Sequence, residues 1–427
     1  MEISFTEDFA KAMALLDSDL PAVMITGKAG SGKSTLLKYF RENTDKNLAI
    51  VAPTGVAALN VQGETIHSFF RFKPNTYLED IKAVRDRSLY KELHTLVVDE
   101  VSMLRVDLLD AIDRFLRINR GKKDIPFGGV RMVFFGDLYQ LPPVVTREDK
   151  ETVLNGYRSP YFFENEGINQ LGMKVFTLEK VFRQEEGEFL SALNRVRTGK
   201  FSDDDLDLLN QRVESNFDPD YSEGVVYLTV TNAIAQEINE YKLNELITEE
   251  VEFNAEVTGE FNTSACPAEE KLLLKAGAQV MFLSNDPEKK WVNGSIGRVL
   301  DVYQNGEENI VSVALSSGEI VEVASYTWEN YKYVVNQDGK VSADKIGTFR
   351  QLPLKLAWAV TIHKSQGKTF EKVYIDLGNR AFAHGQVYVA LSRCPTLAGI
   401  QLKRPIRSTD IIVDSAVRNW SESHSLE

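Results

Sequence analysis

The sequence predicts an α/β protein with two parallel sheets covered by helices. Apolar runs at residues 22–25, 96–98 and 132–135 each end in polar or glycine residues, as expected for buried strands. Patterns of helical period at 35–41 and 108–118 alternate with these runs. This alternation is typical of a parallel sheet with helices on both faces. Further apolar runs at 225–229 and 373–376, and a helical pattern at 386–393, predict a second sheet.

Length and composition limit the class of protein. A chain of 427 residues predicts two to four domains. The sequence is 43% hydrophobic and 26% charged, and no apolar run approaches the ~18 residues of a membrane span. The N-terminus does not resemble a secretory signal, so we expect an intracellular protein. Its two cysteines, Cys266 and Cys394, are too few for a disulfide framework or a four-ligand metal site. A net charge of −13 argues against a generally basic surface but leaves room for a narrow basic groove.

The most specific motif is the glycine-rich loop between the first predicted strand and helix, Gly27-Lys28-Ala29-Gly30-Ser31-Gly32-Lys33-Ser34. Its backbone N–H groups and the helix N-terminus favour a polyphosphate, Lys33 reaches the terminal phosphates, and the Ser34 hydroxyl suits Mg²⁺. The alternative is a structural glycine-rich turn. The predicted nucleotide contacts are Gly30, Ser31, Gly32, Lys33, Ser34 and Thr35.

Polar residues that follow two later strands complete this predicted site. Asp99 would hold Mg²⁺ and Glu100 would polarise the attacking water. Gln140, before the prolines at 142 and 143, would sense the γ-phosphate. The alternatives are an exposed acidic strand end for the first pair and a surface turn for Gln140.

Two arginines of the second half lie near predicted element ends. From there the guanidinium of Arg183 or Arg393 would reach across a cleft to the triphosphate as an arginine finger. Taken alone, each is better explained as an ordinary surface arginine, and the other motifs of the chain reverse this preference.

Four further blocks carry a family resemblance. They are Ala52-Pro53-Thr54-Gly55-Val56-Ala57-Ala58, Thr65-Ile66-His67-Ser68-Phe69-Phe70, the stretch 107–130, and Trp358-Ala359-Val360-Thr361-Ile362-His363-Lys364-Ser365-Gln366-Gly367-Lys368-Thr369. With the glycine loop they follow one another in the order found in the Pif1 family of superfamily 1 helicases. The chain resembles that family from residue 27 to residue 402.

The resemblance implies a channel for single-stranded DNA and a further nucleotide contact. The implied DNA-binding residues are Thr54, Gly55, His67, Ser68, Asn232, Thr361, His363 and Lys364. Gly367 and Lys368 are placed beside ATP. Phe69 and Phe70 would offer faces for base stacking or would belong to the core. In contrast to other helicases of this superfamily, residues 1–26 contain no glutamine to read adenine, and Phe5 or Phe9 would take its place.

The resemblance also implies the domain organisation. Residues 1–179 would form a first RecA-like P-loop NTPase lobe with a short wedge at 64–76. Residues 180–254 and 348–427 would form a second such lobe. Between them, 255–347 would be a small SH3-like β-barrel insertion. The residues themselves support strands at 296–303, 310–315, 320–324 and 331–335, with hairpin signals at Asn305-Gly306, Ser317-Gly318 and Asp338-Gly339.

The implied activity is that of an ATP- and Mg²⁺-dependent helicase that moves 5′ to 3′ on single-stranded DNA. It would unwind 5′-tailed duplex or structured DNA, G-quadruplexes included, in replication, repair, recombination and telomere maintenance. We expect a monomer in the bacterial cytoplasm, associated with the nucleoid. The alternative is a nucleotide-controlled switch or protein-remodelling ATPase, which would leave the second-half motifs unexplained.

Overall fold

The first lobe is built on a six-stranded sheet in which every pair of neighbouring strands runs parallel. The computed structural model describes residues 6–73, 76, 78–151, 154–182, 187–214, 224–305 and 308–424. In spatial order the strands are β3 (Glu64–Thr65), β2 (Leu48–Ala52), β4 (Thr95–Val98), β5 (Arg131–Phe135), β1 (Ala22–Gly27) and β6 (Lys174–Leu178).

Helices cover both faces of this sheet, as the alternating pattern predicts. Successive strand residues point to opposite faces, so Met24 and Phe134 belong to one buried core and Val23 and Val133 to another. All strands and helices predicted for this lobe are confirmed. Its helices are α1 (Glu7–Asp17), α2 (Lys33–Asn43), α3 (Gly55–Asn60), α4 (Ile66–Phe70), α5 (Ser88–Glu92), α6 (Val106–Arg120), α7 (Arg147–Glu151) and α8 (Glu166–Leu171).

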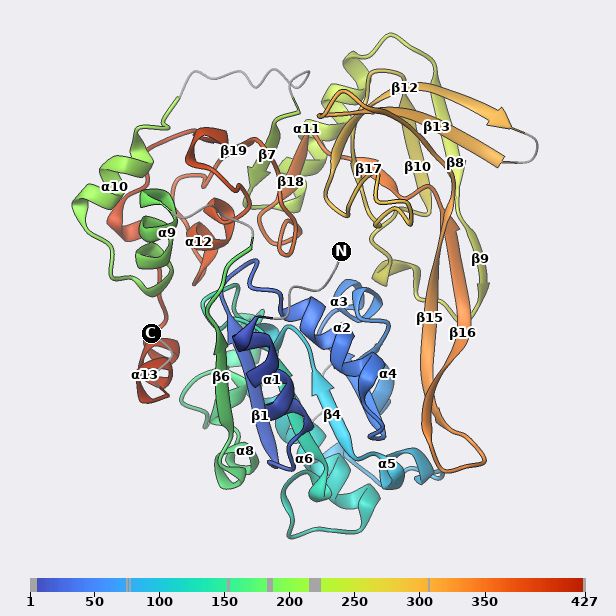
Figure 1. The fold of residues 1–427 in the computed structure, drawn as a ribbon, viewed down its shortest axis with the longest axis vertical. Helices are drawn as coiled ribbons and strands as arrows, with labels where there is room; N and C mark the ends of the chain where they lie inside the picture. Colours follow the sequence, from blue (N-terminus) through green and yellow to red (C-terminus); the bar gives the residue numbers. More distant parts are fainter. Residues whose placement is uncertain are drawn as a thin grey trace.

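The second lobe contains the predicted second parallel sheet. Its strands, in spatial order, are β18 (Ala359–Thr361), β7 (Val226–Thr229), β19 (Val373–Ile375) and β20 (Ile400–Leu402). The accompanying helices are α9 (Glu188–Thr198), α10 (Asp203–Asn210), α11 (Asn232–Glu245), α12 (Gln386–Leu391) and α13 (Ser415–Ser423). Figure 1 shows this lobe above the first, with α13 reaching down beside β6. Trp420 of α13 stacks on Phe163 of the first lobe at 5.1 Å between ring centroids.

Antiparallel sheets replace the parallel pattern between the second-lobe segments. One sheet contains β14 (Ile320–Val323), β13 (Glu308–Leu315), β12 (Ile296–Asn305), β11 (Gln279–Phe282) and β17 (Leu354–Leu356). A second contains β15 (Tyr326–Val335), β16 (Val341–Gln351) and β9 (Glu256–Gly259), and a third pairs β10 (Lys271–Lys275) with β8 (Glu250–Asn254). The turns at Ser317-Gly318 and Asp338-Gly339 are confirmed, and Gly306 lies outside the described residues.

The grouping of the four strands predicted for the insertion is wrong for one of them. The strand predicted at 331–335 exists as part of β15, but it does not join β12, β13 and β14 in one sheet. It begins earlier, at Tyr326, and pairs with the long strand β16 in a hairpin that extends along the first lobe (Figure 1). Alternation along the chain predicts a strand but does not specify its partner.

The β15–β16 hairpin is attached to the first lobe by polar contacts. Ile50 donates its backbone N–H to the Tyr333 hydroxyl at 2.9 Å. The Glu64 carboxylate accepts the backbone N–H of Tyr333 at 2.7 Å, and Asn47 bonds to the hairpin turn. Glu64 begins the expected wedge, whose residues 74 and 75 lie outside the described residues. The hairpin and this segment therefore pack together.

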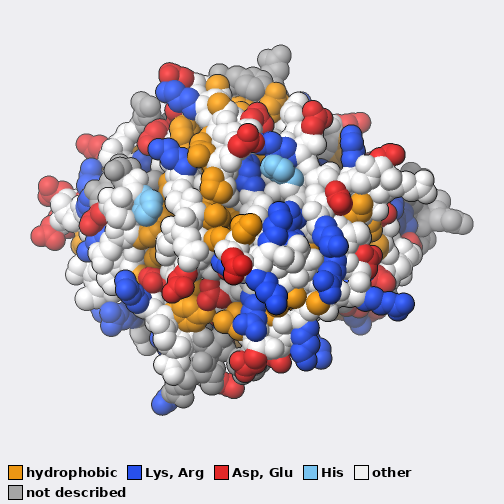
Figure 2. Space-filling view, turned by 90° about the horizontal axis from the view of Figure 1, so that it is seen from below, with side chains coloured by type: hydrophobic (Ala, Val, Ile, Leu, Met, Phe, Trp, Pro, Cys, Tyr) orange, Lys and Arg blue, Asp and Glu red, His pale blue; other side chains and the backbone are white. Residues whose placement is uncertain are grey.

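Charge is unevenly distributed on the surface. Despite the net charge of −13, Figure 2 shows lysine and arginine side chains gathered on one side of the face seen from below, with acidic side chains scattered around them. Within the described part of the chain, we find no helix that is both long and apolar enough to cross a membrane.

Phe69 and Phe70 belong to the core, so the alternative of exposed base-stacking faces is wrong for both. They are 3% and 1% exposed. Phe70 lies edge-on to Phe115 at 5.3 Å and is stacked with Phe72 at 5.4 Å between centroids. The helical spacing that puts His67 on the outside of α4 turns the phenylalanines inward.

Replacing Phe70 by alanine should lower the free energy of unfolding by about 3–5 kcal/mol, because the ring leaves a cavity in a packed aromatic cluster. Phe382→Ala, which removes a ring that is 63% exposed, should change the free energy by no more than about 0.5 kcal/mol. Urea unfolding followed by circular dichroism compares the two. Equal unfolding midpoints would contradict the core assignment.

Candidate active site at the junction of the two lobes

The candidate residues gather at the carboxyl ends of the strands. The glycine loop follows β1, the pair Asp99-Glu100 follows β4, and Gln140 lies beyond β5. The expected DNA-binding residues of the first lobe follow β2 and β3, at the edge of the same sheet. In parallel sheets ligands bind outside the carboxyl ends of strands. The topology therefore places a nucleotide side and a DNA side next to each other.

The glycine loop has the backbone conformation that a phosphate cradle requires. Gly30 and Gly32 have φ values of 80° and 88°, which residues with a Cβ rarely adopt. Gly32 is the N-cap of α2, so Lys33, Ser34 and Thr35 form the first turn of that helix. The N–H groups of this turn and the helix dipole point at the loop.

Two polar groups of the loop fit an anion. The Ser31 hydroxyl is buried and has no hydrogen-bond partner among the described residues. Lys33 folds back over the loop and donates Nζ to the carbonyls of Gly27 at 2.6 Å and Lys28 at 3.0 Å. Burial lowers the pKa of Lys33, and the carboxylates of Asp137 and Glu100 oppose that shift. An ammonium drawn out of water and hydrogen-bonded to carbonyls is suited to a phosphate.

Asp99 and Glu100 form a partly buried acidic pair beside Lys33. Burial raises the pKa of both carboxyls. The negative charge of Glu100 raises the pKa of Asp99 further. Glu100 has φ 51° and ψ 46°, a left-handed conformation uncommon for a residue with a side chain. Such strain is concentrated at functional sites. Within the described ranges no cluster of three metal-ligating side chains occurs, and Mg²⁺ bound through one carboxylate, one hydroxyl and phosphates needs none.

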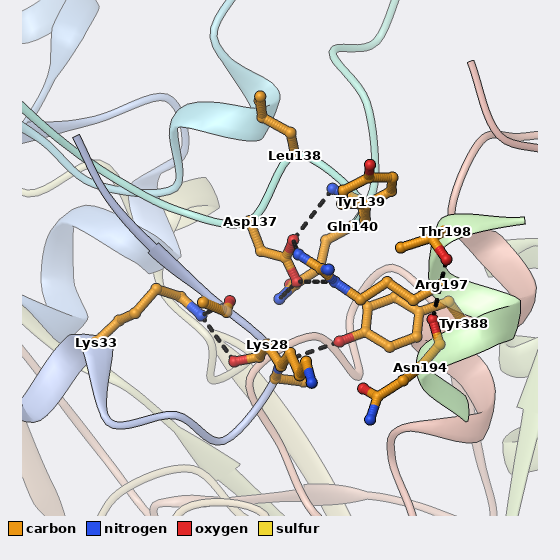
Figure 3. A network of polar contacts seen from close by, with 12 residues as sticks. Lys28, Lys33, Asp137, Leu138, Tyr139, Gln140, Asn194, Arg197, Thr198 and Tyr388 are labelled. Atoms are coloured by element: carbon orange, nitrogen blue, oxygen red, sulfur yellow. Dashed lines mark hydrogen bonds and ion pairs between the residues drawn. The ribbon is translucent and has the colours of Figure 1, made fainter. Parts of the chain in front are cut away.

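Asp137, beyond β5, is bound to Arg197 of α9 in a buried ion pair (Figure 3). Arg197 Nη2 lies 2.7 Å from Asp137 Oδ1, and the two side chains are 8% and 0% exposed. Burial acts to raise the pKa of Asp137, but the charges of Arg197 and Lys33 outweigh it and the pKa is lowered. The guanidinium also lies over the ring of Tyr139 at 4.3 Å. Gln140 donates Nε2 to Asp137 Oδ2 at 3.3 Å.

Other second-lobe residues also contact the first lobe at this junction. The Tyr388 hydroxyl of α12 accepts the backbone N–H of Ala29 in the glycine loop at 3.1 Å. His384 Nε2 lies 2.8 Å from the Leu138 carbonyl. At Gly385 a Cβ would approach the Tyr139 carbonyl to 2.4 Å, so only glycine permits this contact. The two lobes therefore meet closely beside the glycine loop.

Gln366 completes the junction from the opposite side. Its Nε2 donates to Gln140 Oε1 at 2.9 Å and to Glu100 Oε2 at 3.3 Å. It belongs to the turn that follows β18, which also contains His363 and Lys364, expected at DNA, and Gly367 and Lys368, expected at the nucleotide. One amide therefore contacts two predicted catalytic side chains of the first lobe.

The structure places the remaining predicted nucleotide residues on or near that turn. Arg393 is fully buried and donates to the carbonyls of Ser365 and Lys368 at 3.0 Å each. Lys368 donates Nζ to Asn293 Oδ1 at 2.7 Å, and burial lowers its pKa to about 8. Gly367 adjoins it with φ 79°. Arg183 lies outside the described residues.

The expected DNA-binding residues come from the ends of neighbouring strands in each sheet. In the second lobe, Thr361 ends β18 and Asn232 begins α11, just beyond the neighbouring strand β7. Asn232 and Lys364 are exposed, whereas His363 is partly buried, which lowers the pKa of its imidazole. Thr361 is buried, and its Oγ1 accepts the Lys364 N–H at 3.2 Å.

In the first lobe the expected DNA-binding residues lie on α3 and α4. Thr54 caps α3 by accepting the Ala57 N–H, and Gly55 is the first residue of that helix. Ser68 donates its hydroxyl to Glu64 at 2.8 Å. Burial lowers the pKa of the partly buried His67. Phe9, one of the residues considered for adenine, is packed edge-on against Tyr39, and Phe5 lies outside the described residues.

Sequence reasoning missed three residues of this junction, Arg197, Tyr388 and Gln366. Arg197 occurs in an amphipathic helix with several charges, where an inward-facing arginine has no distinct pattern. Tyr388 lies in a predicted helix whose residues are all buried, so the sequence pattern does not set this tyrosine apart from its neighbours. Gln366 stands between two assigned groups, and its position alone was a usable signal.

Fold and site together define a two-lobed P-loop nucleoside triphosphatase whose nucleotide loop faces a second lobe. A model of the PIF1-like helicase family matches residues 10–210. The ATP-dependent DNA helicase Pif1 of Bdellovibrio bacteriovorus is 34% identical over 413 residues, which cover 94% of this chain and 88% of that protein. The chain belongs to the PIF1-like helicase family, and it is an ATP-hydrolysing DNA helicase.

Solved structures of a Bacteroides Pif1 agree with this assignment. Its complex with ADP-AlF4 has a TM-score of 0.91 at 38% identity, covering 99% of this chain and 97% of that one. The same helicase bound to single-stranded DNA has a TM-score of 0.69 at 37% identity, with equal coverage. The chain spans 58% of the ATP-dependent DNA helicase PIF1 of Emericella nidulans, to which it is 31% identical.

Breaking the ion pair between Arg197 and Asp137 should be costly, because either single substitution leaves a buried charge without its partner. Arg197→Met should lower the free energy of unfolding by about 3–5 kcal/mol. Combined with Asp137→Asn it should cost less than the sum of the two changes, with a coupling of about 0.5–3 kcal/mol in a double-mutant cycle.

Arg195→Met is the matched control for this cycle. Arg195 lies on the same helix and pairs with Asp205, but its side chain is 47% exposed. Removing it should cost less than about 1 kcal/mol. Denaturant unfolding measures all four variants, and strict additivity of the two junction changes would exclude an energetic ion pair.

Proposed function

We propose that this helicase moves 5′ to 3′ along single-stranded DNA and separates the strands of 5′-tailed duplex or structured DNA. The observation that supports this is the turn after β18. One tight turn contains residues expected to hold DNA and an amide that contacts the predicted catalytic residues of the other lobe. A change at the nucleotide is therefore passed directly to the DNA-binding side.

For the nucleotide we propose the following roles. The backbone of Gly30 to Gly32 and the side chains of Lys33 and Thr35 bind the phosphates. Ser34 and Asp99 would hold Mg²⁺, which supplies charge neutralisation when it is bound. Glu100 polarises the attacking water, and Gln140 contacts the γ-phosphate.

The second lobe would complete the nucleotide site. We propose that Arg183 and Arg393 add positive charge on that side, and that Gly367 and Lys368 adjoin the nucleotide. The charge of Arg393 already lowers the pKa of Glu100, against the larger effect of burial. Both halves of the triphosphatase are thus encoded in one chain, which supports a monomer.

For the DNA we propose a channel across both lobes that contacts the backbone and does not read bases. Hydroxyls, imidazoles, amide groups and one lysine suit phosphates and sugars without specifying sequence. The residues are Thr54, Gly55, His67, Ser68, Asn232, Thr361, His363 and Lys364. Closure and opening of the lobes would shift the strand by alternating the grip of each side.

We further propose the domain boundaries 1–179, 180–254 with 348–427, and 255–347, with RecA-like lobes and an SH3-like insertion. The two parallel sheets and the separate five-stranded antiparallel sheet support two lobes and an insertion, although β17 of the antiparallel sheet lies beyond the boundary at residue 347. Residues 64–76 would form the wedge, since Glu64 on the edge strand β3 contacts the β15–β16 hairpin. We place the activity in the bacterial nucleoid, in genome maintenance that includes G-quadruplex resolution.

Direction of movement is the first test. With ATP and Mg²⁺, the protein should displace a strand from a duplex with a 5′ single-stranded tail and leave a duplex with a 3′ tail intact. Each base-pair step requires about 1.4 kcal/mol, which nucleotide hydrolysis can supply. A fluorescent strand-displacement assay measures both substrates. Displacement from the 3′ tail alone would refute the proposed direction, and ATPase indifferent to DNA would favour a nucleotide-controlled switch.

Lys33→Ala should abolish ATP hydrolysis and leave binding to oligothymidine within about twofold of the unmodified protein, because Lys33 contacts the glycine loop and is not among the residues proposed to bind DNA. Lys38→Ala on the same helix, where the lysine is 74% exposed, should leave both unchanged. Phosphate release and fluorescence anisotropy measure the two quantities. DNA-stimulated hydrolysis that survives in Lys33→Ala would contradict the proposed role.

A further inference from the structure

Gln366 stands at a chemically specific position between two first-lobe side chains. Its amide nitrogen lies 2.9 Å from Gln140 Oε1 and 3.3 Å from Glu100 Oε2. In its ionised form the Glu100 carboxylate accepts hydrogen bonds only, and the Gln366 amide presents its nitrogen to it. The two N–H groups of one nitrogen thus satisfy two acceptors on different loops of the first lobe.

An attacking water would need the same two acceptors. In the proposed mechanism Glu100 polarises that water, and Gln140 contacts the γ-phosphate beside it, where Gln140 Oε1 would accept the second hydrogen of the water. A water molecule, like a primary amide nitrogen, carries two hydrogens on one atom. While Gln366 bridges Gln140 and Glu100, its nitrogen is bonded to one oxygen of each side chain and stands where a water that bridges these two oxygens would lie.

Gln366 is mechanically tied to the DNA side of its turn. Its backbone N–H donates to the His363 carbonyl at 3.2 Å, and Ser365 donates its N–H to the Thr361 carbonyl at 2.9 Å. Arg393, fully buried, braces the turn through the carbonyls on either side of Gln366. The turn is therefore a stiff unit, and a displacement at His363 or Lys364 must also move Gln366.

We propose that Gln366 is a positioning residue that excludes the attacking water until DNA binds. With no strand on the second lobe, its amide takes the place of the water between Glu100 and Gln140. When a strand engages His363 and Lys364, the turn shifts, the amide leaves, and the water enters. ATP hydrolysis is then coupled to movement along DNA. This inference rests on the proposed function and concerns the regulation of the same site.

Removing the amide should release the restraint without DNA. Gln366→Ala should raise the DNA-independent ATPase rate roughly fivefold to tenfold and leave the DNA-saturated rate unchanged, so stimulation by DNA falls by the same factor. Gln366→Met, which fills the space of the side chain but lacks donors, should raise the rate less than Gln366→Ala and serves if the alanine variant fails to fold.

Binding supplies a second measurement that does not depend on turnover. Because DNA must break the bridge in order to bind, both variants should bind oligothymidine severalfold more tightly than the unmodified protein in the absence of nucleotide. Gln401→Ala is the matched control. Gln401 Nε2 also donates to a carboxylate, Glu214 at 3.3 Å, but both residues belong to the second lobe. This control should leave the rate and the affinity unchanged.

Two outcomes would overturn the inference. One is an unchanged basal rate and DNA affinity in both Gln366 variants. The other is a fall in the rate both with and without DNA, which would mean that the amide assists hydrolysis. Failure of the proposed function is distinguishable, because the unmodified protein would then show no stimulation by DNA at all.

Discussion

The junction between the lobes depends on one buried ion pair, that of Arg197 and Asp137. Neither charge is tolerable alone at this depth, because the cost of removing an ion from water is offset only by an opposite charge in good geometry. The pair therefore fixes where α9 meets the loop after β5, and Gln140 and Tyr139 of that loop are held by the same two side chains. The Tyr388 contact to the glycine loop and the close approach at Gly385 both require this register.

Sheet topology explains why the ion pair between Arg197 and Asp137 lies close to both the nucleotide side and the DNA side of the junction. In the first lobe the central strands β4, β5 and β1 lead to the residues expected at the nucleotide, and the edge strand β3 and its neighbour β2 lead to those expected at DNA. In the second lobe the edge strand β18 ends in a turn that faces both. Because parallel strands place all their carboxyl ends on one side, the residues expected at the nucleotide and those expected at DNA follow strands on the same side of each sheet.

Much of this arrangement could be predicted from the sequence, for local physical reasons. Buried parallel strands are continuous apolar runs, and the glycine loop requires backbone conformations that few other sequences allow, so both leave a readable pattern. Pairing over long distances leaves none. The prediction therefore failed at β15, whose alternation fits either sheet, and Phe69 and Phe70 remained open because an aromatic on a short helix suits a core or a base equally well. Arg197 was missed because its partner, Asp137, is distant in the sequence and is brought to it only by the tertiary fold.

The bracing of the turn after β18 determines how the two ligands can influence one another. Arg393 is buried with its guanidinium directed at carbonyls of its own lobe, including those of Ser365 and Lys368. A guanidinium anchored in this way keeps the turn from absorbing a displacement by local bending, since bending would leave buried carbonyls and donors unpaired. When a DNA strand displaces His363 and Lys364 at one end of the turn, Gln366 at the other end is therefore displaced as well. The charge of Arg393 acts to lower the pKa of Glu100 against the larger effect of burial, and the same guanidinium bonds to the carbonyls of Ser365 and Lys368 on either side of Gln366.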